Sequence, residues 1–168
     1  MNAVNGDMDH AIRTATPDDA EILAELIVEL ATYEKLRDEA DPDPEALRRQ
    51  LSPEAQPRVE AVLAEADTGA AIGFALFFHN YSTFLTNFGV YLEDLYVRPA
   101  YRGRGVGFGL LQRVAQTAHD RGCERLDLAV LDWNAPAIAF YESLGAESLD
   151  EWSTMRLTAE AISDVAGA

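Results

Sequence analysis

The first third of the chain changes from a strand pattern to helical spacing of its apolar residues. Residues 11–15 predict a short strand, and Thr16 followed by Pro17 is an N-cap and first-turn pair that predicts the start of a helix. Apolar residues then recur at helical spacing to about residue 34. A second, short helix is expected at residues 43–51, where an Asp-Pro pair again marks the start.

The middle of the chain predicts antiparallel strands. Two apolar strands are expected at residues 58–66 and 71–80, joined by a short Asp-Thr-Gly turn. A third strand is expected at residues 90–97, and its apolar run is interrupted by two adjacent acids, Glu93 and Asp94. Because side chains alternate along a strand, these two acids are expected on opposite faces of the sheet.

The last third of the chain predicts alternating helices and strands. A Gly-rich turn at residues 102–107 opens an amphipathic helix, which Gly122 ends. A strand at 126–131, a helix at 135–144 and a last strand at 152–157 follow. The whole order is strand, two helices, three strands, helix, strand, helix, strand. It predicts an α/β (α+β) fold with a mixed, mostly antiparallel central sheet rather than a doubly wound one.

Length and composition predict a single domain. The chain has 168 residues, 48% of them hydrophobic and 25% charged, which is enough for a core without cross-links. We expect residues 1–10 to be a short mobile lead-in without signal-peptide character, and residues 11–168 to be one domain. The only cysteine is Cys123, and no apolar run reaches the length of a membrane span. We therefore expect no internal disulfide, no membrane partner and a cytoplasmic location.

The charge balance excludes some partners without naming a substrate. Lys plus Arg number 13 against 29 Asp plus Glu, a net charge of −16, and Lys35 is the only lysine. Such a charge repels nucleic acid and anionic membranes, and it attracts cationic ligands. A heavily acidic, lysine-poor surface also suits a salt-rich cytoplasm, so a halophilic source explains the same excess.

The Gly-rich turn from Arg102 to Gly107 has the chemistry of an anion site. Glycines between a strand and a helix let backbone N–H groups face an anion at the positive end of the helix dipole. The turn lacks the Lys-Ser/Thr of a P-loop, and Phe108 stands where a dinucleotide-binding fingerprint has glycine. On these grounds alone, an ordinary glycine turn explains the residues equally well.

Two blocks of sequence together resemble the GNAT superfamily of acetyltransferases. They are Y-L-E-D-L-Y-V-R-P-A-Y-R-G-R-G-V-G-F-G at residues 91–109 and W-N-A-P-A-I-A-F-Y-E-S-L-G-A at residues 133–146. The residues that fit the family's acetyl-CoA signature and its second segment are Arg102, Gly105, Gly107, Asn134, Phe140, Tyr141 and Gly145. Residues 30–35, 91–94 and 133–136 further resemble the diamine (spermidine/spermine) acetyltransferase branch, which includes thialysine acetyltransferases.

This resemblance implies a GNAT-like fold, with helices on both faces of the sheet, and an acetyl-CoA-dependent N-acetyltransferase. The acceptor would be a primary amine of a small di- or polyamine or of an amine-bearing amino acid, which attacks directly in a ternary complex. An alkylammonium has a pKa of about 10, so a base must remove a proton. Glu93 is the expected base, with a pKa raised by burial in its apolar strand. Tyr141 matches the family's proton donor to the CoA thiolate. The alternatives are a solvated Glu93 and a core Tyr141.

The resemblance also implies which residues bind each substrate. For acetyl-CoA they are Leu95, Tyr96, Val97, Arg102, Gly103, Arg104, Gly105, Val106, Gly107, Phe108, Asn134, Ala135, Pro136 and Ala137. For the amine they are Tyr33, Glu34, Glu93, Asp127, Leu128, Ala129 and Glu151. Carboxylates would hold the ammonium groups, and an aromatic ring would add cation–π attraction. In a chain this acidic, Glu34 and Glu151 are equally well explained as solvated surface acids.

Partners and alternative functions complete the expectations. His10, His79, His119 and Cys123 show no metal-ligand spacing, so no metal is expected. The resemblance implies a homodimer. Two other functions stay open: acetylation of a protein Lys or N-terminus, and a catalytically silent acyl-CoA-binding module. The presence of both Glu93 and Tyr141 disfavours the silent module.

Overall fold

The computed structural model describes residues 10–167. The expected lead-in at residues 1–10 therefore lies outside the described residues, except for His10, which opens the first strand. The chain forms two compact units, one that ends at Ala129 and one that begins at Val130.

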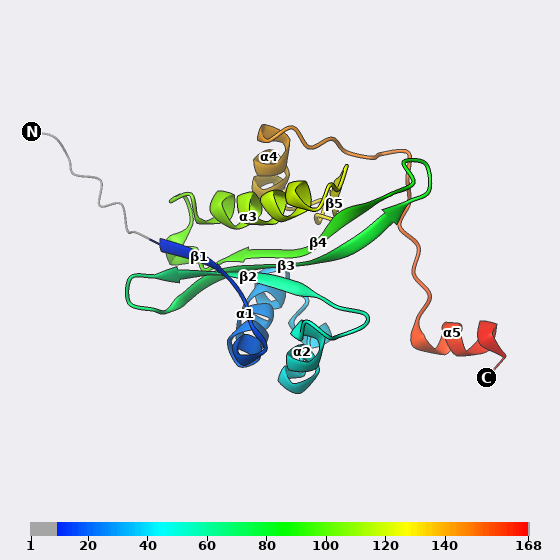
Figure 1. Ribbon diagram of the computed structural model, residues 1–168, viewed down its shortest axis with the longest axis horizontal. Helices are drawn as coiled ribbons and strands as arrows, with labels where there is room; N and C mark the ends of the chain where they lie inside the picture. The colour runs from blue at the N-terminus through cyan, green and yellow to red at the C-terminus, as the bar shows by residue number, and fades with distance from the viewer. Residues whose placement is uncertain (1–9, 168) are drawn as a thin grey trace, which may run out of the picture. The chain divides into compact units, whose positions relative to one another are not determined.

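A five-stranded sheet forms the centre of the first unit (Figure 1). The strand order follows the chain, and all neighbours are antiparallel except β4 and β5, which are parallel. The strands are β1 (His10–Thr14), β2 (Glu60–Ala66), β3 (Ala71–Ser82), β4 (Asn87–Val97) and β5 (Leu126–Leu128). This arrangement confirms the predicted mixed, mostly antiparallel sheet. The strand expected at 126–131 is three residues long, so that prediction overran its end.

Helices cover both faces of this sheet, as predicted. Figure 1 shows α1 (Ala20–Tyr33) and α2 (Pro44–Leu51) on one face and α3 (Val106–Asp120) on the other. Three short 3₁₀ turns, η1 (Pro17–Asp19), η2 (Arg37–Glu39) and η3 (Pro99–Tyr101), complete the unit. The Asp-Pro start signal is confirmed at α2, where the Asp43 carboxylate accepts a hydrogen bond from the Glu45 N–H at 2.9 Å.

The main core lies between α1, α2 and the sheet. Leu23 and Leu26 of α1 are fully buried there against Leu63 and Phe74 of the sheet. The opposite face is covered by α3, whose buried residues are Val106, Leu110, Val114 and Ala118. Burial on both faces explains why β3 has a continuous apolar run instead of alternating apolar and polar residues.

β4 carries one residue more than β3 in the middle of their ladder. Leu76 lies opposite Asp94 and Phe77 lies opposite Leu92, so Glu93 has no partner across the ladder. This extra residue is a β-bulge, which bends its strand and changes the direction in which side chains point.

The second unit contains two helices, α4 (Ala135–Ser143) and α5 (Ala159–Ala166). α4 agrees with the prediction, but the strand predicted at residues 152–157 is wrong: this segment has no regular structure and all its side chains are exposed. A strand needs a partner for its backbone hydrogen bonds, and the described part of this unit contains no other strand. α5 was not predicted, although Thr158 caps its start and Gly167, with φ 71°, ends it.

Candidate active site

The register between β3 and β4 fixes the face on which Asp94 lies. Phe74 and Leu76 of β3 belong to the core that packs on α1. Tyr96 lies opposite Phe74, and Asp94 lies opposite Leu76. Residues opposite each other in a ladder share a face, so Asp94 lies on the α1 face of the sheet.

Glu93 lies on the same face as Asp94. On the other side of the bulge, Tyr91 lies opposite Phe78 and their rings are 5.3 Å apart. Phe78 shares the α1 face with the core residues of β3, and Glu93 is two residues along from Tyr91. The expectation that the two acids lie on opposite faces is wrong, because the extra residue of the bulge resets the alternation.

Asp94 is a partly buried carboxylate in an acidic environment. Burial, with the nearby charges of Glu93 and Glu34, raises the pKa of Asp94 from 3.8 to about 7. Residues 10–167 form no hydrogen bond or ion pair with this carboxylate. Near neutral pH, Asp94 therefore exists as a mixture of its neutral and charged forms.

Glu93 has a different environment from the one that was expected. Its side chain is exposed, although the strand around it is apolar. The bulge explains this difference, since it turns Glu93 out of the ladder while Asp94 stays within it. The desolvated acid of this strand is thus Asp94, whereas Glu93 is exposed to solvent.

The C-terminal end of α1 brings a third acid to this face. Glu34 follows the last residue of α1, is partly buried, and has its pKa raised by that burial. The ring of Tyr33 lies 4.4 Å from the Arg102 guanidinium. The next residue, Lys35, has φ 64° and turns the chain away from the helix. Within the first unit, the fold therefore brings together Tyr33, Glu34, Glu93, Asp94 and Arg102.

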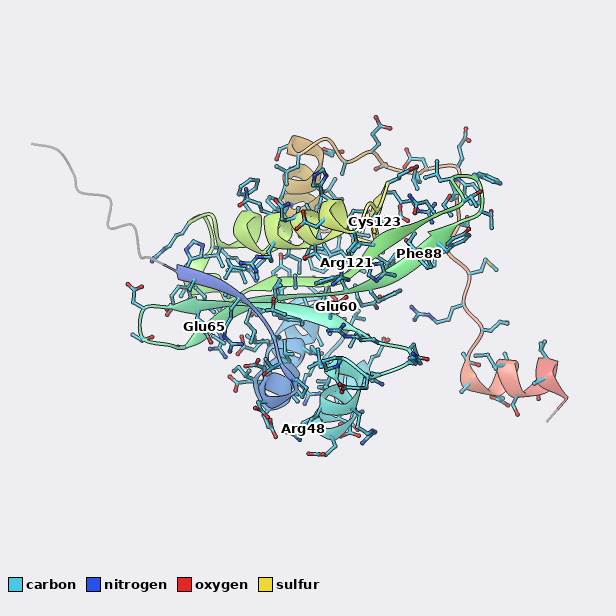
Figure 2. The ribbon with its side chains drawn as sticks, in the orientation of Figure 1. Arg48, Glu60, Glu65, Phe88, Arg121 and Cys123 are labelled. Atoms are coloured by element: carbon cyan, nitrogen blue, oxygen red, sulfur yellow. The ribbon has the colours of Figure 1, made fainter. Side chains whose placement is uncertain are left out.

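Most other partly buried acids of the first unit are neutralised by arginine. Glu60 of β2 accepts two hydrogen bonds from Arg121, at 2.5 and 2.8 Å (Figure 2). Asp19 is bonded to Arg13 at 2.7 Å, and the pKa of Asp19 is lowered from 3.8 to about 2. These pairs stabilise the fold, whereas no arginine within residues 10–167 forms an ion pair with Glu34, Glu93 or Asp94.

The Gly-rich turn between β4 and α3 has the geometry of an anion cradle. Gly103 and Gly105 have φ of 72° and 80°, which other residues adopt only with strain. No atom lies within 4 Å of a Cβ built on either glycine, so the turn has open space beside it. Gly105 is the N-cap of α3, and the first N–H groups of a helix have no partner within it. A turn of this kind at a helix N-terminus can bind a phosphate through its backbone N–H groups.

The edge of β4 beyond the bulge is available to an extended ligand. β5 pairs with β4 only from Val90 to Leu92. From Leu95 to Val97, β4 pairs with β3 alone among the strands of residues 10–167. Unpaired amide groups along a strand can bond to an extended chain as an added strand would.

Two arginines of the turn bind protein groups in this structure. Arg102 Nε donates a hydrogen bond to the Val97 carbonyl at 2.8 Å, and its guanidinium lies 5.6 Å from the Tyr96 ring. The Arg104 guanidinium lies 6.0 Å from the Tyr101 ring. Arg102 therefore connects the end of β4 to α1, in addition to the phosphate role expected for it.

On β5, the expected amine-side residues have mainly structural contacts. Asp127 accepts a hydrogen bond from Asn80 at 2.7 Å and lies 2.9 Å from Arg125 Nε. Leu128 lies opposite Leu92 in the parallel ladder. Ala129 follows the strand and is exposed.

The second unit holds the remaining sequence-predicted residues. Asn134 is buried at the start of α4, where its side chain accepts a hydrogen bond from the Ala137 N–H at 3.4 Å. Tyr141 is partly buried on α4, with its ring 5.2 Å from that of Phe140. Glu151 is exposed and lies outside any helix or strand.

Residues 10–167 contain neither a cluster of metal-ligating side chains nor a membrane-spanning helix. No three or more His, Cys, Asp or Glu side chains are grouped so that they could hold a metal ion. None of the helices in this range is long and apolar enough to cross a membrane.

Comparison with known proteins identifies a family and several relatives of this chain. Residues 23–146 match the model of the acetyltransferase (GNAT) family. A thialysine N-epsilon-acetyltransferase of Bos taurus is 40% identical over 166 residues, which cover 93% of this chain and 96% of the relative. An L-ornithine N5-acetyltransferase of Arabidopsis thaliana is 47% identical over 90 residues, which cover 54% of this chain and 40% of the relative. The solved structure of an integron cassette protein from the mobile metagenome of V. cholerae superposes with a TM-score of 0.77 at 25% identity, covering 96% of this chain and 99% of that one.

Proposed function

Since the chain belongs to the acetyltransferase (GNAT) family and is an N-acetyltransferase, we propose that it moves the acetyl group of acetyl-CoA to a primary amine of a small cationic molecule. Thialysine and ornithine, the substrates in the names of two relatives, both carry a side-chain amine on an amino acid. Diamines and polyamines belong to the same chemical class. The observation that carries this proposal is the group of acids around the bulge of β4, with which no arginine in the described part of the chain forms an ion pair.

Acetyl-CoA supplies an activated acetyl thioester when it is bound. The turn at Gly103–Gly105 and the first turn of α3 would bind its pyrophosphate through backbone N–H groups. The edge of β4 from Leu95 to Val97, beside which residues 10–167 place no second strand, would bind its pantetheine amides. A backbone N–H at this edge would also stabilise the oxyanion of the reacting carbonyl.

The amine would bind on the α1 face of the sheet, where the acids attract its ammonium groups. The amine attacks in a ternary complex after a carboxylate at the bulge has taken its proton, a role expected for Glu93. Tyr141 of α4 would give a proton to the departing CoA thiolate.

Release of the CoA thiol from acetyl-CoA, measured against a panel of amines, tests this proposal. The panel holds thialysine, ornithine, free lysine, putrescine, spermidine and a lysine-containing peptide. Turnover on small amines that decreases strongly in Glu93→Gln and Tyr141→Phe is the expected result. Turnover on the peptide alone would instead assign the enzyme to protein acetylation, and acetyl-CoA binding without any turnover would indicate a silent binding module.

A further inference from the structure

We propose that Asp94 accepts the proton of the substrate ammonium group, and that the neighbouring Glu93 passes this proton to solvent. This inference rests on the proposed function and assigns its proton-transfer step to particular residues. It starts from the difference between two adjacent carboxylates: Asp94 is partly buried, whereas Glu93 is exposed.

The position of Asp94 makes it the better acceptor. It lies within the β3–β4 ladder opposite Leu76, on the face that packs on α1. Loss of water around a carboxylate makes it more basic, and a more basic acceptor takes a proton more readily from an ammonium group. The raised pKa of Asp94, about 7, agrees with this placement.

The charged groups around Asp94 act in the same direction. Glu93 comes from its own strand and Glu34 from the end of α1, and both favour the protonated form of Asp94. β3 contributes the apolar Leu76. The guanidinium of Arg102, in the Gly-rich turn, is bonded to the Val97 carbonyl and stacked over Tyr33.

An arriving ammonium group acts on Asp94 in two steps. It first lowers the energy of the charged Asp94 by pairing with it, as the arginines do for acids elsewhere in the sheet. It then gives up its proton to Asp94, which leaves two neutral groups in a partly buried site.

The protons and bonds of the reaction balance with one proton released. The ammonium nitrogen transfers one proton to Asp94, and the neutral amine forms an N–C bond to the thioester carbonyl. When the tetrahedral intermediate collapses, the C–S bond breaks. The nitrogen loses its second proton as the CoA thiolate gains one through Tyr141. The proton on Asp94 is the net product, and the exposed Glu93 transfers it to water.

The test is the pH dependence of kcat/KM for the wild type and three variants, Asp94→Asn, Glu93→Gln and Glu60→Gln. Glu60 is the matched control, because it is a partly buried carboxylate of the same sheet that is paired with Arg121. We expect the wild type to lose activity about tenfold per pH unit below about pH 7. This decrease is the acidic limb of the pH profile. Asp94→Asn should lose about 100-fold or more in kcat and should lack the acidic limb. Glu93→Gln and Glu60→Gln should keep the limb.

Two controls show whether the decrease of kcat/KM at acidic pH comes from the enzyme or from the substrate. Deprotonation of the substrate also produces a pH limb, so the profile is repeated with an amine of lower pKa: the substrate's limb moves with the amine, and the enzyme's limb stays. A carbon-13 NMR titration of the Asp94 carboxyl group measures its proton directly, without activity. Thermal unfolding of Asp94→Asn verifies that the variant is folded.

The outcomes separate this inference from the proposed function. If the wild type acetylates small amines and Asp94→Asn keeps both its rate and the acidic limb, the assignment of Asp94 is wrong and the proposed function stands. Loss of the limb in Glu93→Gln, with titration of Asp94 near pH 4, would return the role to Glu93. If the wild type acetylates no amine at all, the proposed function fails, and this inference fails with it.

Discussion

Asp94 imposes a cost on folding that grows as the pH rises to about 7. In the folded chain its pKa is raised to about 7 from 3.8. Between about pH 4 and pH 7 the folded state therefore holds a proton that the unfolded state has lost. Its contribution to stability is largest below pH 4, falls as the pH rises through this window, and stays low above pH 7.

Replacement of Asp94 by Asn is predicted to stabilise the protein at about pH 8 by about 1–3 kcal/mol, since the variant has no charge to desolvate. At about pH 4 the two proteins should be equally stable. Urea unfolding of both proteins between about pH 4 and pH 8 measures this difference. If the difference does not grow with pH, Asp94 is not desolvated in the folded chain.

The two glycines that flank α3 allow a matched test of the anion cradle. Gly105 and Gly122 have φ of 80° and 69°, and no atom lies within 4 Å of a Cβ at either position. Alanine at either position should destabilise the fold by about 1 kcal/mol through backbone strain alone. Only Gly105→Ala should raise the KM for acetyl-CoA, by about tenfold, which corresponds to about 1.4 kcal/mol.

Thermal unfolding and steady-state kinetics of the two variants check this prediction. Because Gly122→Ala carries the same strain at the opposite end of α3, it separates strain from loss of phosphate binding. Equal KM values in the two variants would argue against the turn as the pyrophosphate site.

At the scale of elements, one arginine joins α1 to the end of β4. Arg98 lies 2.7 Å from Glu29 and 2.5 Å from Glu25, both on α1, and donates to the Ala71 carbonyl of β3 at 2.8 Å. The hydroxyl of Tyr96 also bonds to Glu29, at 3.2 Å. These contacts position α1, and with it Tyr33 and Glu34, beside the bulge.

Substitution of Arg98 by Met is predicted to destabilise the protein by about 2 kcal/mol, because Glu29 is left partly buried without its partner. It should also raise the KM for the amine, since the end of α1 loses its anchor. Arg48→Ala is the control: its pair with Glu21, at 2.5 Å, joins α2 to α1 on the exposed surface and should leave the melting temperature unchanged. Similar losses in both variants would contradict an anchoring role for Arg98.

The sequence predicts the elements of the first unit well because each has a local signal. The N-cap pairs, the helical spacing and the glycine ends all give patterns over a few residues, and the structure confirms them. The bulge at Glu93 has no such signal. It depends on how β3 and β4 pair, and that register follows from packing on both faces of the sheet. The sequence therefore indicates this strand, but it does not distinguish the partly buried Asp94 from the exposed Glu93.

The strand predicted at 152–157 is wrong for a related reason. Its polar and apolar residues fit a strand, but pairing requires a neighbour that local sequence cannot supply. By contrast, the signals of α5 were present in the sequence: Thr158 at the start and Gly167 after the end.

At the scale of the whole molecule, the net charge of −16 acts on stability and on substrate binding in opposite directions. About 1 M salt shortens the range of charge–charge forces to about 3 Å, which removes most of the self-repulsion. The melting temperature should therefore rise by several degrees between low and high salt. At the same time, kcat/KM for a small diamine should fall, because the attraction for cations is screened.

Calorimetry and kinetics over a salt series check both directions in one preparation. The KM for acetyl-CoA is the internal control, because its anionic groups should bind more tightly as the repulsion is screened. A decrease of the melting temperature with salt would mean that the Arg–acid pairs outweigh the self-repulsion.

The unpaired stretch of β4 beyond the bulge has a consequence for the protein without its ligands. An open strand edge is a template on which other chains can add strands and aggregate. A ligand that binds along Leu95 to Val97 would protect that edge, so acetyl-CoA should act as a solubilising agent as well as a substrate. Without it, the mutual repulsion of highly charged copies is the remaining protection, and high salt weakens that protection while it stabilises the fold. Stored preparations should therefore stay clear longest when acetyl-CoA is present.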